Sequence, residues 1–258
     1  MSFVWPLLNT LQGIFVALWT AFWILVSLAV CPLVRSRRPG LWLARRVWAP
    51  GILKVVGVRL SVEGVEGIDL SRPCFFAANH QSWIDIPALF AALPVPVLFV
   101  AKRELGRVPF LGWFMKAMGM VLVDRGDRKE AVRGIEAAAG QLCEGWSLLS
   151  FPEGTRTADG RVHRFKTAVF AAAIESGAPV VPIALEGADR VLPRDTLRGR
   201  PGWVRIALGE PISTAGFSRD DRAALARQAQ RQVETLLAVL RNELPVEAPV
   251  EEDGLLEA

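Results

Sequence analysis

The chain opens with a long apolar segment that carries no charge. No Asp, Glu, Lys or Arg occurs from Met1 to Val34, and the run from Gly13 to Val34 is interrupted only by Thr20, Ser27 and Pro32. As a helix this run would extend ~33 Å, which is about the thickness of the hydrocarbon core of a bilayer. The pattern predicts a membrane-associated helix that either spans the bilayer or enters one leaflet as half of a helical hairpin.

A second stretch, from Leu41 to Val58, mixes aromatic, aliphatic and basic residues. This mixture is typical of a helix in the headgroup plane. Five arginines lie between Arg35 and Arg46 and favour the cytoplasmic side of the membrane. Because these bases follow the apolar run, a cleaved signal peptide is not expected. Residues 1–56 are therefore predicted to be membrane-associated helices.

From Gly57 onward, short β-rich runs alternate with helical patterns. Several of the runs are almost entirely apolar, as in strands buried on both faces of a sheet. The alternation predicts an α/β domain over residues 57–242, with a mostly parallel or mixed central sheet flanked by helices. The expected strands are Val58–Val62, Cys74–Ala78, Val97–Val100, Met120–Val123, Ser147–Phe151, Val180–Leu185 and Val204–Leu208.

Three longer helices are predicted between and after these strands. The first extends from about Asp127 to Cys143 and begins with a capping-box spacing that includes Glu130. The second is expected from Lys166 to Ser176. The third extends from Ser218 to Asn242, with Ser218 and Asp221 placed to cap it.

Charge is distributed unevenly along the 258 residues. Residues 243–258 hold six acidic residues and no basic one, so we expect a disordered acidic tail. Residues 1–242 contain 30 basic and 20 acidic residues, and 25 of the basic residues are arginine. This balance favours an anionic partner such as nucleic acid, phospholipid headgroups or a phosphorylated substrate. A nucleotide-composition bias toward arginine would give the same balance.

Several classes of site are excluded. The chain has only two histidines and three cysteines without a C-x-x-C pair, so neither a multi-histidine metal site nor a cysteine-rich zinc module is expected. G-x-G-x-x-G, G-x-x-x-x-G-K-[ST], G-x-S-x-G and H-E-x-x-H are all absent. The sequence therefore predicts no metal and gives no sign of dinucleotide or P-loop chemistry.

The segment Ala78–Asp85, with the sequence ANHQSWID, follows an expected strand and is rich in polar residues. In a straight helix His80 and Asp85 would point about 140° apart. A turn into a helix that starts at Ser82 or Trp83 would instead let the Asp85 carboxylate reach the imidazole. Asp85 would then fix the tautomer and leave the other ring nitrogen as a general base. Without a neighbouring Ser or Cys nucleophile motif, a substrate hydroxyl is the expected proton donor. The alternative is that these residues only cap the helix.

Other polar residues also follow expected strands. Phe151–Arg156, with the sequence FPEGTR, can form a loop whose backbone amides and guanidinium hold an oxyanion, or a plain turn in which Arg156 pairs with Glu153. Arg125 follows the strand that ends at Val123. Because ligands of α/β sheets bind outside the carboxyl ends of the strands, we expect these residues to share one crevice.

Four ordered blocks give the sequence a resemblance to the 1-acyl-sn-glycerol-3-phosphate acyltransferase family of glycerolipid acyltransferases. The blocks are N-H-x-x-x-x-D, an arginine-ended strand, F-P-E-G-T-R and V-P-[IV]. The resemblance extends over about residues 57–212. The blocks stand at Asn79–Asp85, Gly119–Arg125, Phe151–Arg156 and Val181–Ile183.

The resemblance implies a role for each matching residue. His80 would deprotonate the glycerol hydroxyl and Asp85 would orient it, so that the hydroxyl attacks an acyl thioester without an acyl-enzyme. Backbone amides near the His80 turn would stabilise the oxyanion. The implied substrate-binding residues are Lys102, Arg125 and Arg156 for the phosphate, Glu153 and Gly154 for the shape of the acceptor pocket, and Thr155.

The predicted function is acyl transfer from acyl-CoA or acyl carrier protein to the sn-2 hydroxyl of lysophosphatidic acid, without a cofactor. The enzyme would be attached to the phospholipid bilayer with its site on the cytoplasmic face, at the inner membrane if the source is bacterial. Two alternatives stay open: O-acylation of another lyso-lipid, such as lyso-ornithine lipid or a lysophospholipid, and a non-catalytic membrane lipid-binding protein. No nucleic acid is expected, because the arginines are spread among strand ends behind a lipid-associated segment.

Overall fold

The computed structural model describes residues 4–124, 128–196 and 198–242. Within this part of the chain seven strands form one sheet in the order β1-β7-β6-β2-β5-β3-β4. Only the β6–β7 pair is antiparallel. The strands are β1 (Val58–Glu63), β2 (Phe75–Ala78), β3 (Val97–Lys102), β4 (Val121–Val123), β5 (Ser147–Ser150), β6 (Val180–Glu186) and β7 (Gly202–Leu208).

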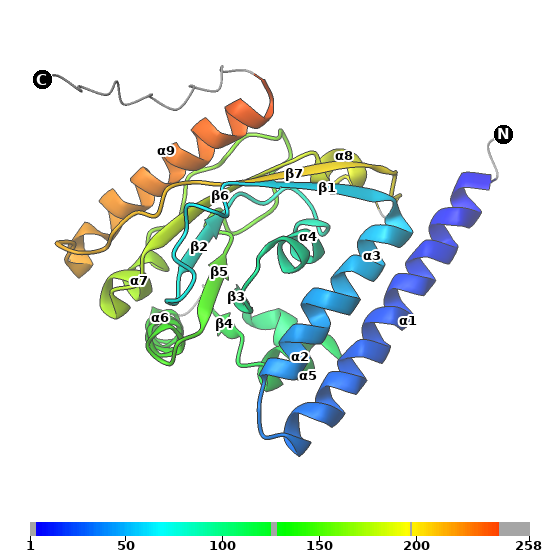
Figure 1. Ribbon diagram of the computed structural model, residues 1–258, viewed down its shortest axis with the longest axis horizontal. Coiled ribbons are helices and arrows are strands. Elements are labelled where there is room, and N and C mark those ends of the chain that lie inside the picture. Colours follow the sequence, from blue (N-terminus) through cyan, green and yellow to red (C-terminus); the bar gives the residue numbers. More distant parts are fainter. Residues whose placement is uncertain (1–3, 125–127, 197, 243–258) are drawn as a thin grey trace, which may run out of the picture.

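The predicted α/β architecture is confirmed, and each expected strand is present to within two residues at either end. The apolar runs mark the centre of the sheet, where β2, β5 and β6 are buried at every position. Helices cover both faces of the sheet (Figure 1). Packing between two helical layers explains why these strands lack the alternation of apolar and polar residues.

The helices of the described residues form two groups. α6, α7 and α9 pack on one face of the sheet, whereas α3 and α4 cover the other, with α1, α2 and α5 beside them (Figure 1). The helices are α1 (Val4–Leu33), α2 (Arg38–Leu43), the π-helical turn η1 (Ala44–Trp48), α3 (Ala49–Val56), α4 (Asp85–Ala92), the 3₁₀ turn η2 (Arg103–Arg107), α5 (Leu111–Ala117), α6 (Arg128–Cys143), α7 (Phe170–Ser176), α8 (Ala188–Val191), the 3₁₀ turn η3 (Arg219–Asp221) and α9 (Arg222–Leu240).

The three longer helices predicted from the sequence are present as α6, α7 and α9. α7 begins four residues later than expected because Lys166 is part of an irregular segment, where its amide donates to the Pro152 carbonyl. The capping box of Ser218 and Asp221 is confirmed and precedes η3. The cap proposed at Asp127 and the acidic tail at residues 243–258 lie outside the described residues.

Residues 4–56 form an antiparallel helical hairpin of α1 against α2, η1 and α3 (Figure 1). The Gln12 side chain donates to the Val55 carbonyl at 3.1 Å, and the Trp19 indole donates to the Trp48 carbonyl at 3.1 Å. Gly51 permits this approach, because a Cβ there would lie 2.7 Å from the Trp19 ring. The hairpin that the sequence allowed is therefore present.

α1 is long and apolar enough to cross a membrane, as judged by length and composition over Leu7–Leu33. Most of this segment is not buried inside the protein, and its outer face exposes large apolar side chains. The second arm of the hairpin is more buried than α1. Its buried residues include Leu41, Ala49, Ile52 and Leu53. That arm packs against α4 and belongs to the core of the domain as well as to the hairpin.

Candidate active site

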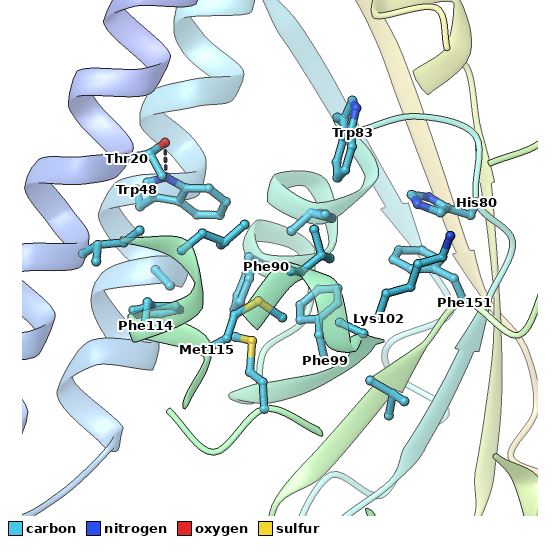
Figure 2. A pocket seen from close by; sticks show the side chains of 18 of the residues that line it. Thr20, Trp48, His80, Trp83, Phe90, Phe99, Lys102, Phe114, Met115 and Phe151 are labelled. Carbon is cyan, nitrogen blue, oxygen red and sulfur yellow. Dashed lines mark hydrogen bonds between the residues drawn. The ribbon is translucent and has the colours of Figure 1, made fainter. Parts of the chain in front are cut away.

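An apolar cavity of about 320 Å³ lies between the carboxyl ends of β2, β3 and β5 and the N-terminal hairpin. Figure 2 shows His80, Phe151 and Lys102 at one end, and Thr20, Trp48 and Phe114 at the other. Aromatic and methionine side chains line the space between the two ends (Figure 2). The cavity therefore has charged and polar side chains at the His80 end and an apolar interior.

The catalytic candidates His80 and Asp85 are in contact at the entrance. Residues 79–84 connect β2 to α4, and Asp85 is the first residue of that helix. His80 Nδ1 lies 2.7 Å from Asp85 Oδ2. The same oxygen accepts the backbone N–H groups of Gln81 at 2.7 Å and Ser82 at 2.8 Å. The expected reach of the carboxylate to the imidazole is therefore present, although the helix begins two to three residues later than proposed.

The geometry assigns different tasks to the two ring nitrogens of His80. An ionised carboxylate only accepts hydrogen bonds, so its contact with Nδ1 selects the tautomer that carries the proton there. Nε2 then keeps its lone pair. The ring stacks on Phe151 with centroids 4.0 Å apart and planes inclined by 14°. With 14% of the side chain exposed, the imidazole is held firmly while still reaching the cavity.

Two buried polar contacts fix the loop that carries His80. Asn79 pairs with the backbone of Leu185 on β6, donating at 3.0 Å and accepting at 2.7 Å. The Ser82 hydroxyl donates to the Leu192 carbonyl at 2.7 Å. These contacts give Asn79 and Ser82 structural roles, and neither contact was predicted from the sequence.

The FPEGTR loop divides its residues between the cavity wall and the support behind it. Gly154, Thr155 and Arg156 line the cavity. Glu153 is buried and is not among the lining residues; its two carboxylate oxygens accept the amides of His80 at 2.8 Å and His163 at 3.0 Å. The alternative pairing of Arg156 with Glu153 is not formed. The Arg156 guanidinium instead lies 4.9 Å above the Trp83 ring.

The backbone amides near His80, which the sequence suggested for an oxyanion site, already donate hydrogen bonds to carboxylates of the protein. The N–H groups of Gln81 and Ser82 donate to Asp85, and the N–H of His80 donates to Glu153. These three amides therefore position the dyad and do not face a substrate oxyanion in this structure.

The chain was compared with known protein families and proteins. Residues 59–186 match the family model described as Acyltransferase. The chain is 36% identical to the lyso-ornithine lipid O-acyltransferase of Pseudomonas aeruginosa, with 81% of each chain covered. It is 30% identical to the 1-acyl-sn-glycerol-3-phosphate acyltransferase of Saccharomyces cerevisiae, covering 92% of this chain and 80% of that one.

The chain belongs to the acyltransferase family. The resemblance expected from the four motif blocks is thus confirmed. The crystal structure of the 1-acyl-sn-glycerophosphate acyltransferase PlsC from Thermotoga maritima matches with a TM-score of 0.79 and 26% identity, covering 94% of this chain and 98% of that one. The similar chloroplast enzymes are longer: the chain spans 45% of the 1-acyl-sn-glycerol-3-phosphate acyltransferase BAT2 of Brassica napus, to which it is 35% identical.

The candidate site brings together most of the residues expected from sequence. His80, Lys102, Gly154, Thr155 and Arg156 line one cavity, and Lys102 is the last residue of β3. Arg125 lies outside the described residues. Sequence reasoning missed Phe151 as the stacking partner of His80, although its place at the head of the FPEGTR block was a usable signal.

The buried carboxyl of Glu153 gives the stability of the protein a testable pH dependence. Burial raises its pKa above the ordinary value of 4.5, against the opposing effect of its two amide hydrogen bonds. The folded protein then binds a proton here more readily than the unfolded chain does, so Glu153 favours folding most at low pH and less as pH rises through its folded pKa. The unfolding free energy of the wild type minus that of Glu153→Gln should decrease from about pH 4 to about pH 7.

Denaturant titrations in detergent at several pH values measure this difference. Asp159→Asn provides the matched control, because hydrogen bonds lower the pKa of the exposed Asp159 carboxyl. The unfolding free energy of the wild type minus that of Asp159→Asn should increase as pH rises. If the free-energy difference for Glu153→Gln also increased with pH, burial would not raise the pKa of Glu153.

Proposed function

We propose that this chain is a 1-acylglycerol-3-phosphate O-acyltransferase that forms phosphatidic acid at a membrane surface. The observation that carries the proposal is the His80–Asp85 pair at the mouth of a cavity with an apolar interior and a cationic entrance. The apolar interior suits an acyl chain, and Lys102 and Arg156 suit a phosphate.

In the proposed reaction, His80 acts as general base. Its Nε2 takes the proton of the sn-2 hydroxyl as the hydroxyl oxygen attacks the carbonyl carbon of the acyl thioester. The tetrahedral intermediate then collapses, the C–S bond breaks, and the imidazolium returns the proton to the leaving thiolate. Asp85 stabilises the imidazolium between these steps. The thioester is already activated, so the reaction as proposed requires no metal or cofactor.

The substrates are proposed to approach from different sides. The lipid acceptor would enter from the leaflet in which the hairpin is embedded, and acyl-CoA or acyl carrier protein would arrive from the cytoplasm. Arginines at the turn of the hairpin support the cytoplasmic assignment. The active site would then lie at the cytoplasmic face of the inner membrane if the source is bacterial.

The outer face of α1 provides the test of membrane attachment. Deleting residues 1–56 would also remove buried core residues of α2 and α3, so a point substitution is cleaner. Leu18 is 67% exposed, and an Asp in the hydrocarbon region costs about 2.5–3.5 kcal/mol. Leu18→Asp should lower partitioning into phospholipid vesicles by about 10²-fold, measured by flotation.

Val132→Asp serves as the matched control, because Val132 is an exposed residue of α6 on the opposite face of the sheet. It should float with vesicles as the wild type does. Equal flotation of wild type, Leu18→Asp and Val132→Asp would show that α1 is not the anchor.

A second candidate acceptor is lyso-ornithine lipid. The similarity to the Pseudomonas aeruginosa lyso-ornithine lipid O-acyltransferase favours it, since it covers four-fifths of both chains. The same His80 and Asp85 would acylate its hydroxyl, but this acceptor carries no phosphate for Lys102 and Arg156. The cationic entrance therefore favours the phosphorylated acceptor.

The deciding experiment supplies the full chain in vesicles with labelled acyl-CoA or acyl carrier protein and a panel of lyso-acceptors. We expect phosphatidic acid from 1-acylglycerol-3-phosphate, and none with His80→Ala. A product confined to acylated lyso-ornithine lipid or another lysophospholipid would identify that lipid as the acceptor and overturn phosphatidic acid as the product. The absence of any His80-dependent product would favour a non-catalytic lipid-binding protein.

A further inference from the structure

Two arginines from distant parts of the sequence meet beside the catalytic cavity. Arg156 Nη1 donates to the Arg194 carbonyl at 3.0 Å, and Arg194 Nη1 donates to the Arg156 carbonyl at 2.9 Å. Arg194 lies in the loop between α8 and β7, outside residues 59–186 that match the family model. The reciprocal bonds hold each guanidinium next to the backbone of the other residue.

This pair is tied to the His80 turn by two further contacts. The amide of Thr157, which follows Arg156, donates to the His80 carbonyl at 2.8 Å. Leu192, two residues before Arg194, accepts the Ser82 hydroxyl. Arg156 itself lines the cavity together with His80 and Trp83. Arg194 is not itself among the lining residues, but its guanidinium contacts the backbone of Arg156, which is.

The two guanidiniums have little negative charge around them. Among the residues that the structure describes, no carboxylate lies within ion-pair distance of Arg156, and the carboxylate nearest to Arg194 is that of Asp195 at 4.0 Å. Asp195 is 93% exposed, so water screens this contact. Nearby arginines differ, since Arg190 and Arg205 both pair with the buried Glu186.

Each guanidinium is held against the backbone of the other arginine with little counter-charge around it, so an anion with two charges would be attracted to both. The planar fork of a guanidinium matches the oxygens of a phosphate, and two such forks can bind different oxygens of one group. The aromatic face of Trp83 keeps Arg156 oriented without neutralising it. The arrangement fits a dianionic phosphate monoester.

We propose that Arg194 and Arg156 together bind the phosphate monoester of the acyl acceptor, with Arg194 as an additional specificity-determining residue. This inference rests on the proposed function, because it assigns the phosphate to 1-acylglycerol-3-phosphate. Coenzyme A also carries a phosphate monoester, so the experiment varies the two substrates separately.

The test measures kcat and the apparent KM for 1-acylglycerol-3-phosphate and for acyl-CoA in mixed micelles. Arg194→Ala should raise the KM for the phosphorylated acceptor by about 10-fold or more, while the KM for acyl-CoA and kcat change by less than about twofold. Arg198→Ala is the matched control, an exposed arginine of the same loop. It should leave both KM values unchanged.

Two further variants separate a binding role from a structural one. Arg194→Lys should recover only part of the affinity, because an ammonium ion lacks the planar fork. The double variant of Arg156 and Arg194 should raise the acceptor KM by a factor different from the product of the single effects, since the two side chains would bind the same group. With 1-acylglycerol, an acceptor that lacks the phosphate, the wild type and Arg194→Ala should have the same apparent KM for the acceptor.

The outcomes are distinguishable. If the wild type does not acylate 1-acylglycerol-3-phosphate, the proposed function fails. If the wild type does so and Arg194→Ala behaves like Arg198→Ala, only the assignment of Arg194 is overturned. If Arg194→Ala raised only the KM for acyl-CoA, Arg194 would bind the phosphate of coenzyme A and the assignment to the acceptor would be wrong.

Discussion

Replacing His80 by alanine should lower kcat for acyl transfer by about 10²–10⁴-fold, because a positioned general base contributes about that much and no other histidine or carboxylate is among the described residues that line the cavity. The apparent KM for the acyl donor should change little, because the apolar walls that would hold the acyl chain stay intact. The measurement is the initial rate with labelled acyl-CoA at saturating acceptor. Folding should persist, since the imidazole lies at the cavity surface and the backbone contacts of His80 do not use its side chain.

His163→Ala is the matched control. It removes the only other histidine of the chain, whose exposed side chain is paired with Asp159. Its backbone bond to Glu153 would survive the substitution. We expect kcat within about twofold of the wild type. If His80→Ala retained wild-type turnover, general-base catalysis by His80 would be wrong.

The central sheet could be predicted from sequence for a physical reason. Strands covered by helices on both faces must be apolar at nearly every position, and each such run is bounded by turn residues. β2 and β6 show this pattern, and their predicted limits differ from the observed ones by a single residue. The sequence carries less information on short elements. α5 and α8 occupy segments for which no helix was predicted, because four to seven residues hold too few turns to show a helical period.

The dyad was predictable because both of its residues lie on one local turn. His80 follows β2 and Asp85 starts α4, so five residues of chain determine their contact. The hairpin was harder to predict. Proline and glycine at positions 50 and 51 favour a break in its second arm, yet the π-helical turn η1 runs directly into α3, with Pro50 in the first turn of α3.

The shared crevice at the strand ends could be predicted, but the specific contacts between distant segments could not. The carboxylate of Glu153 is bound by the amides of His80 and His163, which are 73 and 10 residues away in sequence. Arg194 contacts Arg156 across 38 residues. A single sequence gives residue types and local period, whereas these partners depend on which loops the sheet order brings together. The order β6-β2-β5-β3 places the loops after β2 and β5 side by side, and this order was not contained in the local patterns.

The contribution of Asp85 can be separated from that of His80 by replacing it with asparagine. Asp85 Oδ2 accepts hydrogen bonds from the imidazole and from two backbone amides, whereas the other carboxylate oxygen is buried without a partner among the described residues. In one orientation, asparagine keeps the accepting oxygen and places its NH₂ group at the position of that second oxygen. In the other orientation, its NH₂ group faces His80 Nδ1 and selects the wrong tautomer. Both orientations remove the negative charge that stabilises the imidazolium.

Asp85→Asn should therefore lower kcat by about 10²–10⁴-fold, with the KM values for donor and acceptor changed by less than about threefold. Ser82→Ala is the comparison for loosening of the same turn, because it removes the hydroxyl's bonds to the Leu192 carbonyl and the Ile84 amide but leaves the Ser82 amide on Asp85. The double variant of His80→Ala and Asp85→Asn should be no slower than His80→Ala alone, since an aspartate that acts only through the imidazole has no effect once the imidazole is gone. A double variant much slower than His80→Ala would show instead that Asp85 acts on the substrate or on the fold independently of His80.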